Sequence, residues 1–438
     1  EIKIISMKEN FKDYIWSFFG KLIGLIGIFL VNIVVSNNLS VDNFAQFSIL
    51  MSIIPSMVAI TTFGQEFSSS KMLNTSTGWK NHIRNISMIL VLNFSLLFFL
   101  FLFIGNFYVF DKSILFILFF IICFSSIMRV ISDYSRATYN FKGFILYNSI
   151  RSNGGIIFWL FFLILLSILL ITDTLSIVNI FISMASSCFI VLFFFFFVQF
   201  SKKDFVKNIV SIFNRRTHNF FTFYKTSFYL MLSGLLIMLR FDHDIWIVSY
   251  AAGNQDVALY ASIIKIVALV MAPIAIFESL IPKKIAALYN KNDMISLEHY
   301  VRRISSFIFI SGLPFILLIY IFAGEILYYT FGEFYTNAEN GLRLALFAFC
   351  GNILLGPCGP ILLIIKYEKI NVLVNFLFLI ISVILGTYLT LTFGYHGMII
   401  NYIIILNLIH IVFYILLIKY LKINPLPYLN FFRVLKNN

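Results

Sequence analysis

The chain is short of charge. Only 12% of its 438 residues are Asp, Glu, Lys or Arg, whereas 61% are hydrophobic. Soluble domains carry about 25% charged residues, and no water-soluble core would absorb this much apolar sequence. The composition therefore excludes an ordinary soluble domain and indicates a chain that lies largely in a membrane.

Motifs for metal, nucleotide and acyl chemistry are missing as well. The four cysteines lie in apolar runs without the spacing of metal ligands or of a disulfide framework, and the six histidines show no ligand spacing. No phosphate-binding glycine loop and no nucleophile elbow occurs, which argues against ATP hydrolysis and acyl transfer. We expect no cofactor, no metal and no enzymatic activity.

Long apolar runs dominate what is present. A helix that crosses the hydrocarbon core needs about 20 residues. Runs of about that length or longer, bounded by polar or turn residues, lie near 14–36, 43–65, 83–106, 113–135, 144–171, 175–200, 226–250, 257–282, 300–323, 340–366, 371–393 and 396–420. The predicted fold is an all-α polytopic membrane protein with twelve spans in two six-helix bundles around a central cavity.

Positive charge marks one side of the membrane. Of the 32 Lys and Arg residues, 28 lie in or beside alternate gaps between the apolar runs. Positive residues stay cytoplasmic when helices insert, so both termini are expected in the cytoplasm. The net charge of +13 then reflects topology and attraction to anionic membrane lipids. Nucleic acid is not an expected partner, because no basic stripe accompanies a folded soluble module.

The longest polar interruption divides the chain into halves. We predict an N-terminal bundle, an amphipathic cytoplasmic linker, a C-terminal bundle and a cytoplasmic tail at residues 1–200, 201–225, 226–420 and 421–438. In the linker, Phe205, Ile209 and Phe213 repeat at helical spacing against basic residues. This pattern favours a helix in the head-group layer, with a solvated basic linker as the alternative.

Several basic residues lie inside the predicted spans, where a charge costs about 3 kcal/mol unless it meets a partner or water. Lys21 lies about two turns into the first span, Arg240 well inside the seventh, and Lys265 about two turns into the eighth. Together with Arg151, they are candidates to line a chamber for an anionic head group, since guanidinium and ammonium groups bind phosphate. Snorkelling to the surface is the alternative for Lys21 and Lys265.

Acidic residues in or near the spans are candidates for coupling to an ion gradient. They are Asp242, Asp244, Glu278 and Glu66. Asp242 and Asp244 flank a histidine, an arrangement that suits proton or sodium coupling. A structural ion pair between Arg240 and Asp244, four residues apart, is the alternative for that helix. For Glu66 the alternative is a position at the membrane surface.

A third group lies near the cytoplasmic end of the fourth span. Arg129, Asp133 and Arg136 are spaced so that they share one helix face. We interpret them as a candidate contact for the ligand at the cytoplasmic mouth. A structural ion pair is the alternative.

The chain resembles the Wzx-type oligosaccharide flippases of the multidrug/oligosaccharidyl-lipid/polysaccharide exporter superfamily over its whole length. The residues that carry the resemblance are Gly20 to Phe47, Ser132 to Ala137, Leu239 to Asp242, Ala258 to Ala261, Pro273, Ile281-Pro282, Phe331 to Tyr335 and Gly356 to Pro360. In the related lipid II flippases, basic residues on the first, second and eighth spans hold the diphosphate. Lys21 and Lys265 match by span, whereas the second span here has no Lys or Arg before Lys71.

The resemblance implies a bacterial inner-membrane flippase. Its expected cargo is an undecaprenyl-diphosphate-linked oligosaccharide repeat unit, moved from the cytoplasmic to the outer leaflet by alternating access. Protons or sodium ions are the expected driving force, and polysaccharide polymerase and chain-length machinery are the expected protein partners. The alternatives are a multidrug exporter of the same fold, which would prefer an acidic or apolar cavity, and a membrane enzyme that polymerises the sugar repeats.

Overall fold

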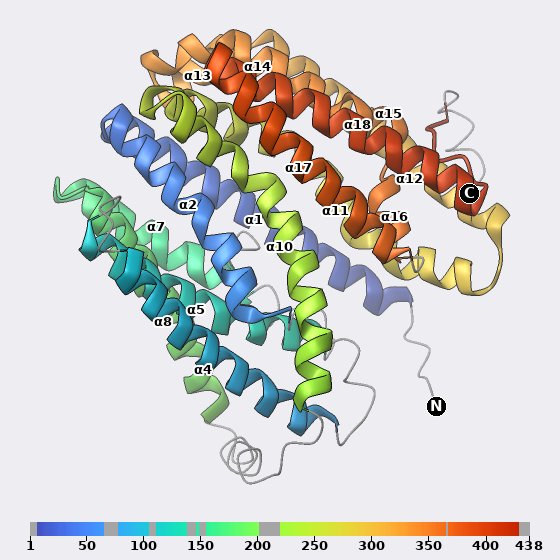
Figure 1. Ribbon diagram of the computed structural model, residues 1–438, viewed down its shortest axis with the longest axis horizontal. Coiled ribbons are helices and arrows are strands. Elements are labelled where there is room, and N and C mark those ends of the chain that lie inside the picture. The colour runs from blue at the N-terminus through green and yellow to red at the C-terminus, as the bar shows by residue number, and fades with distance from the viewer. Residues whose placement is uncertain are drawn as a thin grey trace. The chain divides into compact units, whose positions relative to one another are not determined.

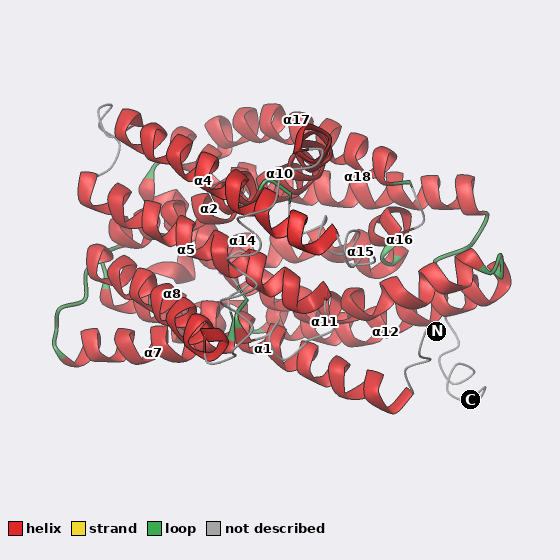
Figure 2. Cartoon of the chain, turned by 90° about the horizontal axis from the view of Figure 1, so that it is seen from below, coloured by secondary structure: helices red, strands yellow, loops and turns green. Residues whose placement is uncertain are grey.

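The computed structural model describes residues 7–64, 78–104, 111–137, 146–148, 155–200, 220–364 and 367–428. Every regular element within these residues is a helix (Figure 2). The chain divides into two compact units. Unit 1 comprises Glu1–Val31 and Leu50–Leu239, and unit 2 comprises Asn32–Ile49 and Arg240–Asn438.

The helices that contribute to unit 1 come mainly from the first half of the chain (Figure 1). They are α1 (Met7–Asn38), α2 (Val41–Thr62), α4 (Gly78–Ile104), α5 (Lys112–Ala137), α7 (Ile156–Ile171), α8 (Ile177–Phe200) and α10 (Phe220–Ala251). The unit boundaries fall within α1, α2 and α10. The chain therefore passes from one unit to the other within three continuous helices and not in the loops between helices.

Unit 2 contains the remaining helices, several of them short. They are α11 (Asn254–Asn290), α12 (Met294–Ile321), α13 (Ala323–Phe331), the 3₁₀ turn η2 (Glu333–Ala338), α14 (Glu339–Ala345), the 3₁₀ turn η3 (Leu346–Phe349), α15 (Cys350–Leu355), α16 (Cys358–Ile364), α17 (Glu368–Phe393) and α18 (Tyr395–Leu421). The last two helices lie side by side (Figure 1).

Length and hydropathy make this a multi-pass membrane protein. Among the described residues, six helices are long and apolar enough to cross a membrane, and three shorter apolar helices accompany them. Large apolar side chains such as Ile171, Leu96 and Ile384 are more than 60% exposed. In water such exposure would be costly, but in lipid it places apolar groups against apolar chains.

Several polar groups in these helices find hydrogen-bond partners within the protein. In unit 1, the hydroxyl groups of Thr61 and Ser126 bond to each other, and Asn93 Nδ2 donates to the Thr61 carbonyl at 3.0 Å. In unit 2, Asp256 Oδ2 accepts from the Tyr395 N–H at 2.9 Å, which satisfies a donor at the start of α18. Hydrocarbon supplies no hydrogen bonds, so these internal partners are a condition for the helices to lie in a membrane.

The tenth predicted span, 340–366, is broken. It consists of α14, η3, α15 and α16, and the chain turns sharply at Gly356 between the last two. Gly356 has φ 76°, a conformation that favours glycine, and Ser305 packs where a side chain would begin. Pro357 directly precedes α16, at a position where its missing N–H is not needed for a helical hydrogen bond.

A short stretch after α18 returns to the outside of α12. Lys422 ends α18 in a left-handed conformation, with φ 54°. The Tyr428 N–H donates to Ser306 Oγ at 2.8 Å, and the Tyr428 hydroxyl lies 2.6 Å from Nδ1 of His299. The Arg302 guanidinium stacks 4.1 Å from the centre of the Tyr428 ring. The first part of the tail is thereby fastened to the N-terminal half of α12.

That half of α12 begins with a capping interaction. Asp293 precedes the helix, and its Oδ1 accepts from the Ser296 N–H at 3.1 Å. The hydrogen bonds from Ser296 hold the pKa of the exposed Asp293 carboxyl below its ordinary value. The start of α12 is therefore defined by sequence-local chemistry.

The predicted linker, 201–225, falls mostly outside the described residues. Residues 201–219 lie outside them, and Phe220–Lys225 form the start of α10. The amphipathic helix over residues 205–213 and the division at 200, 225 and 420 stay predictions. The two compact units are defined by contacts instead, and unit 2 includes the segment 32–49 from the N-terminal half.

Close packing of α17 against α18 yields a first test. A side chain at Gly397 would run into the Leu389 carbonyl and approach the Thr390 nitrogen at 2.8 Å, and backbone cannot move aside as a side chain can. We expect Gly397→Ala to destabilise the protein by about 1–3 kcal/mol, seen as a lower thermal unfolding midpoint in detergent. Gly312→Ala is the matched control, since it meets only the flexible end of Ile353, at 3.0 Å. Equal midpoints for the two variants would contradict this packing.

Candidate functional site

A carboxylate on α10 is buried with two partners. Asp244 is 3% exposed, and its Oδ2 accepts from the Tyr260 hydroxyl of α11 at 2.8 Å. Its Oδ1 lies 3.0 Å from Nε2 of the neighbouring His243, which is itself 6% exposed. Hydrogen bonds to a buried carboxylate offset much of the cost of removing it from water. The α10–α11 contact thus encloses a carboxylate, an imidazole and a phenol.

The imidazole extends this group to α17 and α18. His243 Nε2 lies 2.9 Å from Ser382 Oγ on α17, and Asn401 on α18 donates from Nδ2 to the same oxygen at 2.9 Å. The side chains of Ser382 and Asn401 are buried, at 2% and 0% exposure. His243 Nε2 therefore lies within hydrogen-bond distance of both a carboxylate and a hydroxyl.

A second chain of hydrogen bonds begins four residues earlier on α10. Arg240 donates from its guanidinium to Asn375 Oδ1 at 2.8 Å. Asn375 Nδ2 donates to Asn371 Oδ1 at 2.8 Å, and Asn371 Nδ2 donates to the Gly359 carbonyl at 3.0 Å. The contact with Asn375 orients the guanidinium against a neutral amide, so this hydrogen bond does not neutralise its charge.

Lys265 lies on α11 and is partly buried. Its ammonium group interacts electrostatically with the Asp242 carboxylate of α10. Arg240 also interacts electrostatically with Asp244, as their spacing of four residues leads one to expect. Two cations and two carboxylates thus share one region of unit 2, and protonation of His243 would give that region a net positive charge.

These residues form what we call the α10 cluster: Arg240, Asp242, His243, Asp244, Tyr260, Lys265, Asn371, Asn375, Ser382 and Asn401. All ten belong to unit 2. Among the described residues, no group of three His, Cys, Asp or Glu side chains is arranged to hold a metal ion. The cluster itself combines charged side chains with neutral hydrogen-bonding groups.

The remaining predicted site residues are not part of the described cluster. Lys21 lies in α1 and Glu278 in α11, but their side chains fall outside the described residues, as do those of Asp133 and Arg136 in α5. Arg151 and Glu66 lie outside the described residues altogether. Arg129 is partly buried on α5, in unit 1. The roles proposed for these residues stay predictions.

The sequence reasoning missed the neutral members of the cluster. Asn371, Asn375 and Ser382 recur at intervals of four and seven in an otherwise apolar run, so they share one face of α17. Asn401 faces them from α18 through its bond to Ser382. A search for polar residues at helical spacing inside apolar spans would have found three of these four.

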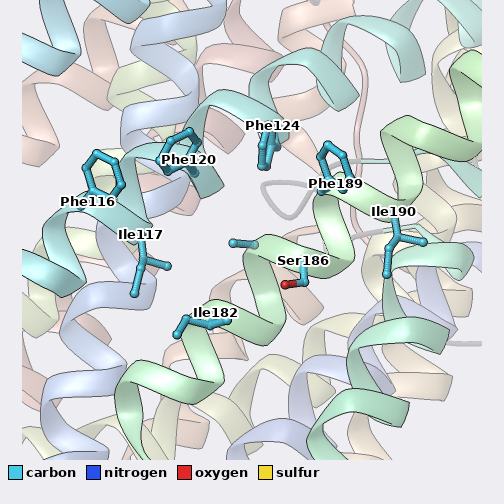
Figure 3. A pocket seen from close by; sticks show the side chains of 9 residues that line it. Phe116, Ile117, Phe120, Phe124, Ile182, Ser186, Phe189 and Ile190 are labelled. Carbon is cyan, nitrogen blue, oxygen red and sulfur yellow. The ribbon is translucent and has the colours of Figure 1, made fainter.

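Unit 1 contributes an apolar groove of about 340 Å³ between α5 and α8. Phe116, Phe120 and Phe124 line it from α5, opposite Ile182 and Phe189 of α8 (Figure 3). Phe116 and Phe189 are 57% and 56% exposed, so the groove opens outward. Apart from the Ser186 hydroxyl, its lining side chains are apolar and suit hydrocarbon.

Helix order and span composition together define a polytopic helical membrane protein. No model of a protein family matches the chain, and no curated protein matches it. Solved structures do match. The inward-facing conformation of a multidrug resistance MATE family transporter of the MOP superfamily is 18% identical, with a TM-score of 0.67 over 91% of this chain and 95% of that one.

Two further structures have the same fold. The lipid II flippase MurJ, in its inward closed conformation, is 14% identical, with a TM-score of 0.66 over 93% of this chain and 87% of that one. A MOP superfamily transporter from Pyrococcus furiosus Vc1 (DSM3638), described as having a binding pocket of reverse polarity, is 14% identical, with a TM-score of 0.63 over 94% and 96%. The chain therefore shares the fold of these structures, which confirms the predicted all-α, twelve-span class.

The buried phenol gives a test of the cluster itself. Tyr260 is 1% exposed, and Tyr260→Phe would remove its hydrogen bond to a carboxylate while preserving the ring. We expect a loss of about 1–3 kcal/mol, measured as a lower thermal unfolding midpoint in detergent. Tyr388→Phe is the control, because Tyr388 is 65% exposed. If the two substitutions had the same effect, the Asp244–Tyr260 bond would not be part of the folded protein.

Proposed function

We propose that the protein is a flippase for undecaprenyl-diphosphate-linked oligosaccharide repeat units in a bacterial cytoplasmic membrane, with both termini in the cytoplasm. The observation that supports it most is Arg240, a guanidinium in the predicted seventh span that is oriented by a neutral amide at 2.8 Å. An ionised side chain in a span costs free energy, so such residues usually mark a ligand or ion site. A planar guanidinium can donate two parallel hydrogen bonds to phosphate oxygens. Lys265, on the adjoining helix, supplies a second cation.

The similarity to a lipid II flippase in fold supports the same class of cargo. In the proposed cycle, the diphosphate binds Arg240 and Lys265, and Lys21 and Arg151 add positive charge. The sugars occupy a polar cavity while the polyprenyl chain stays in the bilayer. Arg129, Asp133 and Arg136 contact the cargo at the cytoplasmic mouth. Alternating access then presents the cargo to the outer leaflet.

Protonation couples this cycle to an ion gradient in our proposal. Arg240 and Lys265 are balanced by Asp242 and Asp244 when His243 is neutral. In this scheme a proton on His243 changes the charge of the cluster and thereby its affinity for an anion. Asp242 and Asp244 would hold the proton or a sodium ion, and Glu278 and Glu66 are further candidates for this role.

A multidrug exporter is the second candidate, and specific observations favour it. Asp242 and Asp244 are carboxylates inside a span, the α5–α8 groove is aromatic, and one of the matching structures is a multidrug resistance transporter. Such a protein would bind lipophilic cations. Cells that lack the gene would then be more susceptible to cationic drugs and would keep normal surface polysaccharide, whereas loss of a flippase has the opposite pattern.

The cationic residues provide the direct test. We expect Arg240→Ala and Lys265→Ala each to raise the KM for lipid-linked oligosaccharide about 10- to 100-fold in proteoliposomes, because each removes charge-assisted hydrogen bonds to phosphate. Arg240→Lys should fall between Ala and the unchanged protein, since an ammonium group keeps the charge but not the planar fork. Full surface-polysaccharide production by both Ala variants, at normal protein levels, would exclude the diphosphate site.

The imidazole tests the coupling. We expect His243→Gln to transport at a rate that no longer depends on pH, because the amide keeps the contact with Ser382 but cannot take up a proton. His396→Gln, a substitution in the same unit at the start of α18, is the control and should keep the pH dependence. If His243→Gln keeps it too and Asp242→Asn abolishes dependence on sodium, the coupling ion is sodium.

A further inference from the structure

The hydrogen-bond chain from Arg240 has one direction. Each member donates to the next: the guanidinium to Asn375, the Asn375 amide to Asn371, and the Asn371 amide to the Gly359 carbonyl. A positive charge at the start of such a chain polarises each amide in turn and strengthens every later donor. The charge of Arg240 therefore strengthens the bond that α17 makes to Gly359.

Gly359 is placed directly after the break in the tenth span. It is the second residue of α16, three residues beyond Gly356. A side chain at Gly359 would approach the Phe413 ring of α18 at 3.0 Å, so the glycine lets α16 lie close to α18. Asn371 and Asn375 are 6% and 5% exposed, so water does not readily replace the chain.

We propose that Asn371 and Asn375 are positioning residues that tie the Arg240 guanidinium to α16, so that the charge at Arg240 controls how firmly α16 is held at the Gly356 break. An anion that takes the guanidinium N–H groups weakens the polarisation of Asn375 and, through Asn371, loosens the Gly359 carbonyl. The helix α16 then turns about Gly356. This residue has a positive φ and, because it lacks a side chain, can adopt backbone conformations that other residues avoid. The anion in this scheme is the diphosphate of the proposed cargo, so that part rests on the proposed function.

A native cysteine reports on the movement. Cys358 is the first residue of α16, is fully buried, and donates from Sγ to the Leu355 carbonyl across the break at 3.2 Å. In a chain with Cys123→Ala, Cys188→Ala and Cys350→Ala, the rate of modification by N-ethylmaleimide in proteoliposomes measures how often α16 moves away. That chain is the reference protein for the comparisons below.

Without any ligand, Asn371→Leu should raise the rate of Cys358 modification about five- to tenfold, the effect of a buried hydrogen bond on an opening equilibrium. Arg240→Gln should raise it as well, because the charge that polarises the chain is gone. Folding of each variant is judged by a single symmetric peak in size-exclusion chromatography. If Asn371→Leu does not fold, Asn371→Ala replaces it in the comparison.

Asn407→Leu is the matched control. Asn407 on α18 also ties the broken span, accepting from the Gly351 N–H at 2.7 Å and donating to the Phe347 carbonyl at 3.1 Å, but these bonds lie before the break. The link is refuted if Asn371→Leu and Arg240→Gln leave the rate of the reference protein unchanged, or if Asn407→Leu raises it equally.

A second arm uses undecaprenyl diphosphate as the probe. It should raise the rate of Cys358 modification several-fold in the reference protein and leave that rate unchanged in the Asn371→Leu variant. In transport assays, Asn371→Leu should lower kcat but change KM by no more than about twofold, because the variant keeps Arg240. If undecaprenyl diphosphate has no effect on the reference protein, the proposed cargo is wrong. The link from Arg240 to α16 is then still decided by the modification rates of the variants without ligand. A KM for Asn371→Leu raised as far as that of Arg240→Ala would overturn the positioning role.

Discussion

Hydrocarbon offers no hydrogen bonds, and this constraint decides where the polar groups of the protein can lie. Hydroxyl groups on lipid-facing turns satisfy themselves within their helix, as Ser95 does with the Val91 carbonyl at 2.9 Å. Groups that cannot do so must meet a partner on another helix. Arg240, Asp244 and Asn401 all find such partners, and the helices α10, α11, α17 and α18 are held together where those partners meet.

Glycine makes these meetings possible. Gly397 lets α18 approach the α17 backbone, and Gly359 lets α16 approach the Phe413 ring of α18. The same residue type interrupts the tenth span at Gly356, where the backbone takes a positive φ. Close packing and a local break thus lie within one set of helices. Two asparagines connect Arg240 to α16, directly after the break at Gly356.

The charged part of the cluster was visible in the sequence because an ionised residue inside an apolar run is expensive and therefore rare. Arg240, Asp242, Asp244 and Lys265 stood out for that reason. Neutral amides and hydroxyls cost less free energy to bury than charged groups and occur on any face of a span, so Asn375 and Ser382 are not conspicuous in the sequence. Their importance depends on which helix packs against α17, and long-range contacts of this kind leave no mark in a single sequence.

The break in the tenth span shows the same division. Residues 340–366 were expected as one span, since hydropathy averages over the Gly356-Pro357 pair without registering its conformation. Hydrophobic length by itself determined that this is a many-span membrane protein, because the free energy of transfer from water to lipid depends on which residues a segment contains and on how long it is. Only the tertiary structure decided that Asp244 meets Tyr260 and that Arg240 reaches Gly359 through two asparagines, because hydrogen bonds need partners within about 3 Å and correctly aimed.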